Sequence, residues 1–111
     1  MSGRRIGASL LGVVTLLPGL AAADRGEEVY NQTCVACHGS DGTGAMPGTP
    51  DFRAPDGVLS KPDAVLMDHI LNGFQAPDSP MAMPAKGGNP GLSEADVRAV
   101  LAYLHREFGS R

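Results

Sequence analysis

Apolar side chains recur at helical spacing in the last part of the chain. The apolar positions there are Val97, Val100, Leu101, Leu104 and Phe108. Steps of three and four residues place them on one face of a helix. Ser93, with Asp96 three residues later, is the sequence signature of a capping box, and Gly109 marks the end. The pattern therefore predicts an amphipathic helix between Ser93 and Gly109.

The same spacing predicts a middle helix. Its recurring positions are Val65, Leu66, His69, Ile70 and Leu71. Ser60 and Asp63 resemble a second capping pair ahead of this run, and Gly73 stands where a C′ glycine would end the helix.

A first helix is predicted from about Arg25. Asp24 is a good N-cap, with Glu27 at the box position, and the glycine-rich run 39–44 must end the helix. The stretches 45–59 and 74–92 are rich in Pro and Gly, lack a helical period and are expected to be loops. No strand pattern is visible. The predicted fold class is all-α, with three main helices and long loops in one small domain.

Residues 1–23 have the composition of a secretory signal peptide. Arg4 and Arg5 form a basic head, an uncharged stretch follows from Ile6 to Leu20, and three alanines precede Asp24. A membrane anchor is the alternative, but the apolar run has 15 residues and contains Pro18, whereas a spanning helix needs about 20 apolar residues. We expect a mature domain of residues 24–111 that is periplasmic or otherwise exported.

The expected mature domain is acidic. It carries all 12 acidic side chains and 7 of the 9 basic ones, a formal charge of −5. This charge disfavours nucleic acid and anionic membranes as partners and favours a protein with a basic docking face. A domain of this size also struggles to bury enough apolar surface alone, so a cofactor at its centre would help to stabilise it.

Cys34-Val35-Ala36-Cys37-His38 is the C-x-x-C-H motif of covalent haem attachment. Cysteines three residues apart lie on one face of a helical turn, so both sulfurs can reach the vinyl groups of one haem edge. A disulfide is the simplest alternative in an exported protein. A thioredoxin-like dithiol would need a βαβ context, and a zinc site would need further ligands. The motif predicts one covalently bound haem c, with His38 as an iron ligand and the long loops wrapped around it.

With this motif in place, the chain resembles the monohaem class I cytochromes c, particularly the short bacterial ones. Gly26 and Tyr30 lie eight and four residues before the first haem cysteine, as the family's glycine and aromatic residue do. The resemblance implies that the glycine lets the first helix cross the last one closely, near Val100 and Tyr103. The segment between Gly73 and the Met-Pro pair is longer than in many relatives.

The resemblance also implies a second iron ligand. Met83-Pro84 matches the family's Met-Pro pair, which makes Met83 the expected axial ligand, with Met81 as the alternative. His69 and His105 each lie in a predicted regular helix rather than in a loop free to approach iron, so a bis-histidine haem is disfavoured.

Supporting residues are also implied. In the family a proline carbonyl accepts a hydrogen bond from the iron-bound histidine, and Pro50 is the best match, with Pro47 second. Arg53 and Lys86 are candidate partners of the haem propionates, against the alternative of plain solvated charges.

We expect the protein to carry single electrons between redox proteins and not to be an enzyme, because filled axial positions leave no place for substrate. One alternative is a haem-bearing subunit of a larger dehydrogenase or oxidase complex. Another is a ligand-binding or peroxidase-like haem protein with an open iron, which the presence of Met83 disfavours.

Overall fold

The computed structural model describes residues 25–109, together with residues 3, 7 and 11–13. Most of the predicted signal peptide, and the predicted N-cap Asp24, lie outside these residues. The described part is helical, and its one β-pairing is an isolated antiparallel bridge between Phe74 and Met83. The all-α prediction is confirmed. None of the described helices is long and apolar enough to cross a membrane.

The last helix, α4 (Glu94–Phe108), has the predicted ends. The Ser93 hydroxyl accepts a hydrogen bond from the N–H of Asp96, and the Asp96 carboxylate accepts one from the N–H of Ser93, each at 3.0 Å. Gly109 closes the helix by donating its N–H to the His105 carbonyl at 3.1 Å. The predicted capping box satisfies two of the backbone N–H groups that a helix start leaves free.

The first helix changes its hydrogen-bond pattern along its length. Residues 25–29 are α-helical, η1 (Tyr30–Cys34) is a π-helix, and α2 (Val35–His38) is α-helical again. Within the π-helix, the N–H of Val35 donates to the Tyr30 carbonyl, five residues earlier. This turn holds one residue more than an α-helical turn, a feature that the sequence pattern did not predict.

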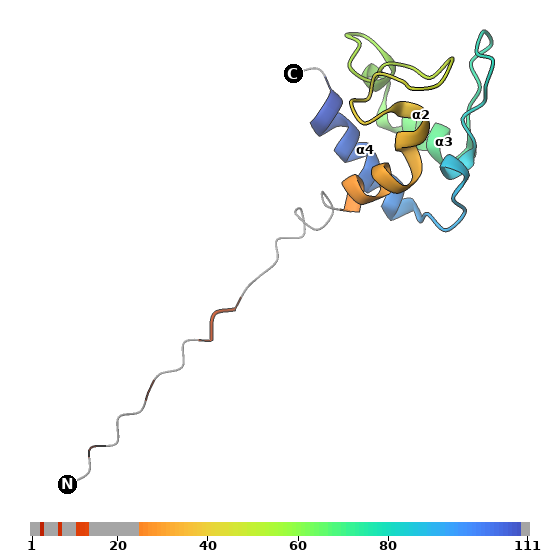
Figure 1. Ribbon diagram of the computed structural model, residues 1–111. Coiled ribbons are helices and arrows are strands. Elements are labelled where there is room, and N and C mark those ends of the chain that lie inside the picture. The colour runs from red at the N-terminus through yellow and green to blue at the C-terminus, as the bar shows by residue number, and fades with distance from the viewer. Residues whose placement is uncertain (1–2, 4–6, 8–10, 14–24, 110–111) are drawn as a thin grey trace.

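The first helix crosses α4 at Gly26, and the two lie side by side in Figure 1. A β-carbon on Gly26 would lie 2.2 Å from the Ala99 carbonyl oxygen and 2.9 Å from the Tyr103 β-carbon. Only a hydrogen atom fits there, which confirms the close crossing. Beside it, the Arg25 guanidinium donates to Asp96 at 2.9 Å and holds the pKa of that carboxyl well below its usual range.

The middle helix, α3 (Asp63–Asn72), ends at Gly73 with φ 82°, as predicted. The predicted Ser60–Asp63 cap is wrong. Pro62 occupies the N-cap position and has no side-chain acceptor, while the Ser60 hydroxyl donates to the Gly57 carbonyl at 2.6 Å in a local turn. Asp63 instead contacts His105 of α4, with 2.8 Å between carboxylate oxygen and Nε2.

The loops contain two short 3₁₀ turns, η2 (Val58–Ser60) and η3 (Ala85–Gly88). Loop 39–57 closes on the end of α4: the N–H of Phe52 donates to the Gly42 carbonyl at 2.8 Å, and a β-carbon on Gly42 would lie 2.8 Å from the Phe108 ring. Gly42 also has φ 76°, a backbone conformation that favours glycine. Both the contact with Phe108 and the backbone conformation therefore require glycine at this position.

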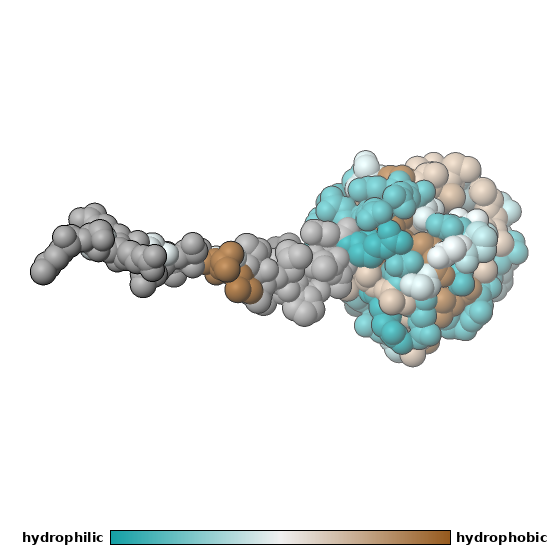
Figure 2. All heavy atoms as spheres, turned by 90° about the horizontal axis from the view of Figure 1, so that it is seen from below, coloured by the Kyte–Doolittle hydropathy of each residue, from teal (hydrophilic) through white to brown (hydrophobic). Residues whose placement is uncertain are grey.

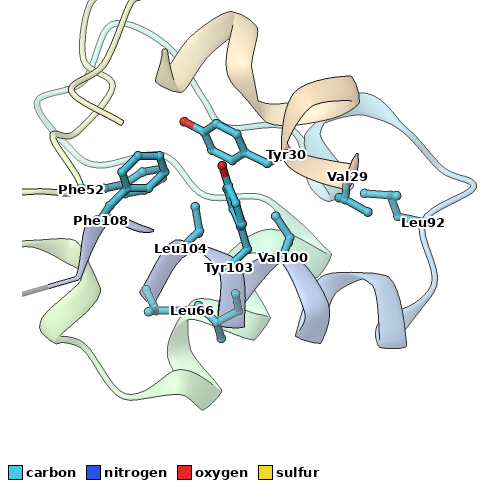
Figure 3. Packing of buried hydrophobic residues seen from close by; sticks show 10 residues of the cluster. Val29, Tyr30, Phe52, Leu66, Leu92, Val100, Tyr103, Leu104 and Phe108 are labelled. Carbon is cyan, nitrogen blue, oxygen red and sulfur yellow. The ribbon is translucent and has the colours of Figure 1, made fainter. Parts of the chain in front are cut away.

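Aromatic rings join the first helix, loop 39–57 and α4 into one core (Figure 3). The Tyr30 ring lies 5.4 Å from Tyr103 and 5.5 Å from Phe108, measured between centroids, and Phe52 packs on Phe108 at 6.0 Å. Tyr30 also donates its hydroxyl proton to the Gly39 carbonyl. The core therefore reaches the residue that follows the C-x-x-C-H motif.

Replacing Gly26 with Ala should destabilise the fold by about 1–3 kcal/mol, the usual cost of overpacking, because the new methyl group would overlap backbone that cannot move aside easily. Chemical denaturation measures this loss. Gly91→Ala is the matched control: its β-carbon would meet only the Asn89 side chain, at 3.2 Å, and stability should change by less than about 0.5 kcal/mol. Equal stabilities of the two variants would contradict a tight crossing.

Candidate cofactor site

An apolar cavity lies between the first helix, the two long loops, α3 and α4. The motif residues line one part of it, segments 47–52, 58–59 and 74–87 contribute others, and Val100, Leu101 and Leu104 of α4 close it. Among the described residues that line this cavity, none is acidic, and Lys86 is the single Lys or Arg. The cavity suits a large, flat, mostly apolar molecule.

Cys34 and Cys37 both line the cavity, are half-buried and are not joined to each other. Burial raises the pKa of the Cys34 thiol to about 11, and the neighbouring Cys37 adds to this. This arrangement differs from the disulfide alternative, because both thiols are free. Among the described residues, no group of three or more His, Cys, Asp and Glu side chains could hold a metal ion.

His38 is buried, with 9% of its surface exposed, and its ring stacks on Phe52 at 4.4 Å between centroids. Its Nδ1 atom is buried and has no hydrogen-bond partner. Burial lowers the pKa of His38 to about 4, so the imidazole is neutral at pH 7. A neutral imidazole is the form that binds a metal ion.

The predicted hydrogen bond from His38 to a proline carbonyl is absent, for Pro50 and for Pro47 alike. The reason lies in the path of the loop. The carbonyl groups of Thr49 and Pro50 face Gly44, where an added β-carbon would lie 2.6 Å and 3.5 Å from their oxygens. Phe52, rather than a proline, is the loop residue in contact with the imidazole.

Met83 and Met81 both line the cavity. The backbone of Met83 is held by two hydrogen bonds to Phe74, of 2.7 Å and 3.0 Å, and its side chain is half-buried. Met81 is 44% exposed and bonded through its carbonyl to the hydroxyl of nearby Ser79. The backbone of Met83 is therefore held from outside segment 75–82, and both methionines reach the same cavity.

The two remaining histidines differ in position. His69 of α3 lines the cavity and stacks on Phe74, with 3.9 Å between ring centroids. His105 of α4 contacts Asp63 of α3 at an exposed position and does not line the cavity.

Of the two cations considered for a negatively charged cofactor edge, Lys86 lines the cavity and Arg53 does not. Lys86 adopts a left-handed backbone conformation with φ 54°, next to Gly87 with φ 61°. A β-carbon on Gly87 would lie 2.6 Å from the Thr33 methyl carbon, so this turn packs directly against the first helix, one residue before the motif.

Sequence reasoning missed Phe52 and Phe74 as site residues. Both lie in stretches without a helical or strand period, where position in the chain says little about which side chains will meet. Their aromatic character within glycine- and proline-rich loops is the single signal that could have indicated them.

Comparison with known proteins identifies the site. The family described as cytochrome C oxidase, cbb3-type, subunit III, matches residues 21–104. Cytochrome c-555 of Prosthecochloris aestuarii is 33% identical over 84 residues, which cover 74% of this chain and 84% of that protein. Cytochrome c-555 of Chlorobaculum tepidum is 31% identical, over 91% of this chain and 94% of that protein.

Two longer proteins also match. Subunit CcoP of a cbb3-type cytochrome c oxidase from Rhodobacter capsulatus is 36% identical over 82% of this chain, and a lupanine 17-hydroxylase [cytochrome c] from Pseudomonas is 35% identical over 78%. The chain spans 31% of the length of the first protein and 11% of the second. With the C-x-x-C-H motif on the wall of an apolar cavity, these matches show that the chain belongs to the matched family, as a monohaem cytochrome c domain with a covalently bound haem c.

Proposed function

We propose that this chain is exported and carries single electrons between redox proteins, with haem attached to Cys34 and Cys37 and its iron held by His38 and Met83. The observation that carries the proposal is that all four side chains line one apolar cavity, although Met83 comes 45 positions after His38 in the sequence. Bound haem would supply one-electron exchange between ferric and ferrous iron.

The residues of the cavity fit a haem. Each thiol can add across a vinyl group, so that its sulfur and hydrogen end on the two carbons of the former double bond. The neutral imidazole of His38 and the thioether of Met83 are ligands of the type that low-spin electron-transfer haems use. The buried Nδ1 of His38 can donate a hydrogen bond but has no acceptor. In the haem-bound protein a small adjustment of loop 44–50, or a water molecule, would supply that acceptor.

The remaining lining keeps water and substrates away from the iron. The walls are mostly aliphatic and aromatic, and Leu66 and Leu101 are nearly fully buried beside them. A buried, apolar environment with two protein ligands leaves no open position for bond chemistry, which supports electron transfer over a peroxidase-like role.

Export is proposed from residues 1–23, on the basic head, the apolar stretch and the small residues Ala21 and Ala23. The intact mass of the protein secreted by its host, measured after acid-solvent extraction, tests export and attachment together. The expected mass is that of residues 24–111 plus one haem, because thioethers survive extraction.

Single replacements Cys34→Ala and Cys37→Ala should leave one thioether or none. A chain with one thioether keeps the full haem mass and a chain with none loses it, so the fraction of chains that carry the haem mass should fall in each variant. A wild-type mass that includes the residues from Met1 would contradict export with cleavage before Asp24. A wild-type mass without haem would contradict covalent attachment.

The ligand assignment is tested by two matched replacements. Met83→Leu should abolish the sulfur-to-iron charge-transfer band of the ferric protein, open the iron to carbon monoxide and lower the reduction potential, because a thioether ligand favours ferrous iron. Met81→Leu should do none of this and should cost less than about 1.5 kcal/mol in stability, as a near-isosteric swap.

The reverse pattern would transfer the ligand role to Met81 and leave electron transfer intact. Ready binding of carbon monoxide to the wild-type protein would instead indicate an open iron and favour the ligand-binding alternative.

A haem-bearing subunit of a larger oxidase or dehydrogenase is the second candidate. It is supported by the matched family, whose description is that of an oxidase subunit, and by the similarity to CcoP. The free carrier is supported by the two cytochromes c-555, which this chain matches over most of their length. Hydrophilic residues cover much of the face in Figure 2, with apolar residues between them, as a transient partner surface would have.

Salt dependence separates the two candidates. A free acidic carrier that docks on a basic face should exchange electrons more slowly as ionic strength rises, because charges beyond about 8–10 Å are screened at physiological salt. Stopped-flow kinetics with a basic redox protein measures the slope. Rates that do not change with salt would favour an apolar, permanent interface and thus the subunit.

A further inference from the structure

Phe74 holds the backbone of Met83 in place. Its N–H donates to the Met83 carbonyl at 3.0 Å, and the N–H of Met83 donates back to the Phe74 carbonyl at 2.7 Å. This pair is the isolated bridge of the described chain. Gly73 packs on the same strip: a β-carbon there would lie 2.9 Å from the Met83 carbonyl oxygen. The end of α3 is thus joined to Met83 through the backbone.

The Phe74 ring is itself fixed by neighbouring side chains. His69 of α3, five residues earlier in the chain, stacks on it with 3.9 Å between ring centroids and 13° between ring planes. The ammonium of Lys61 lies 5.5 Å from the Phe74 ring centroid, within the range of a cation–π contact. Phe74 is nevertheless 41% exposed, so its position depends on these contacts more than on burial in the core.

Segment 75–82 holds Met83 less directly. Its hydrogen bonds are local, between Ser79 and Ala76, Ser79 and Met81, and Gln75 and Ser79. Its contact with loop 39–57 is made by Ser79 and Pro80, which pack on Gly48. Methionine has a flexible side chain, and a thioether is a weak ligand whose strength depends on how well its sulfur is held. The contact that fixes the start of this loop therefore matters for the sulfur at its end.

We propose that His69 and Phe74 are positioning residues that hold Met83 for coordination: the stack fixes the Phe74 ring, and the Phe74 backbone fixes Met83. The proposal rests on the proposed function, in which Met83 is the iron ligand. In this role His69 is a stacking partner of Phe74 and not an iron ligand. It can therefore line the cavity while it stays in the regular helix α3.

The test compares His69→Ala, His69→Phe and Phe74→Ala in the haem-bound protein. Val65→Ala is the matched control, because Val65 is similarly exposed, at 38%, lies on the same helix and does not line the cavity. Two readouts are used: the intensity of the sulfur-to-iron band in the ferric protein, and the affinity of the ferric iron for imidazole, which competes with the thioether.

His69→Ala and Phe74→Ala should weaken the band and raise the imidazole affinity about tenfold, equivalent to about 1.4 kcal/mol. His69→Phe should restore both readouts to near the wild-type values, because a phenyl ring stacks as well as an imidazole. Val65→Ala should change neither. If the stack served only stability, His69→Ala and Phe74→Ala would lower the unfolding midpoint, but band intensity and imidazole affinity would not differ between His69→Ala and His69→Phe.

Wild-type band intensity and imidazole affinity in both alanine variants would overturn the proposal. Failure of His69→Phe to rescue His69→Ala would also overturn it, since His69 would then act through its nitrogens. Met83→Leu distinguishes failure of this positioning role from failure of the proposed function. If the band is lost in Met83→Leu but not in the alanine variants, Met83 is still the ligand and only the positioning role is wrong. If the band survives Met83→Leu, the ligand assignment itself is wrong. Should Phe74→Ala fail to fold, the two His69 variants decide.

Discussion

The backbone contact between Gly26 and Ala99 sets the geometry on which the haem site depends. Two helices can approach this closely only where one of them carries no side chain, and Gly26 supplies that position. Once the crossing is fixed, Arg25 reaches Asp96 on one side, and Tyr30 packs against Tyr103 and Phe108 on the other. The far end of the same helix then carries the two cysteines and the histidine to the cavity.

The Asp96 carboxylate has two roles at this crossing, one in its ion pair with Arg25 and one in the cap of α4. Asp96 caps α4 through the N–H of Ser93 and also accepts from Arg25 of the first helix. One carboxylate therefore fixes the start of one helix and its alignment with another. The low pKa of Asp96 follows from the same arrangement, because hydrogen bonds to the charged form favour it.

Local patterns predicted the parts of the structure that depend on local interactions. The capping box of α4, its apolar face and the glycine at the end of α3 are all found as expected, since each needs only a few neighbouring residues. The cap of α3 was wrong because Pro62 takes the position next to the helix, and pairing rules based on spacing alone do not weigh that. The contacts of Phe52 with His38 and of Phe74 with His69 join separate segments, so no local pattern could indicate them.

The π-helical turn before the haem motif has a consequence for how this chain can change in length. Because the π-helical turn already holds one residue more than an α-helical turn, removing one residue from it would give an α-helical turn and leave Gly26 and the cysteines facing as they do now. Adding a residue elsewhere in this helix would instead rotate the cysteines by roughly 100° relative to Gly26. The hydrogen bonds of segment 75–82 are local, and Ser79 and Pro80 pack against Gly48 of loop 39–57. A change in the length of that segment would therefore also act on the loop that carries Gly48, whereas the first helix can lose one residue more easily than it can gain one.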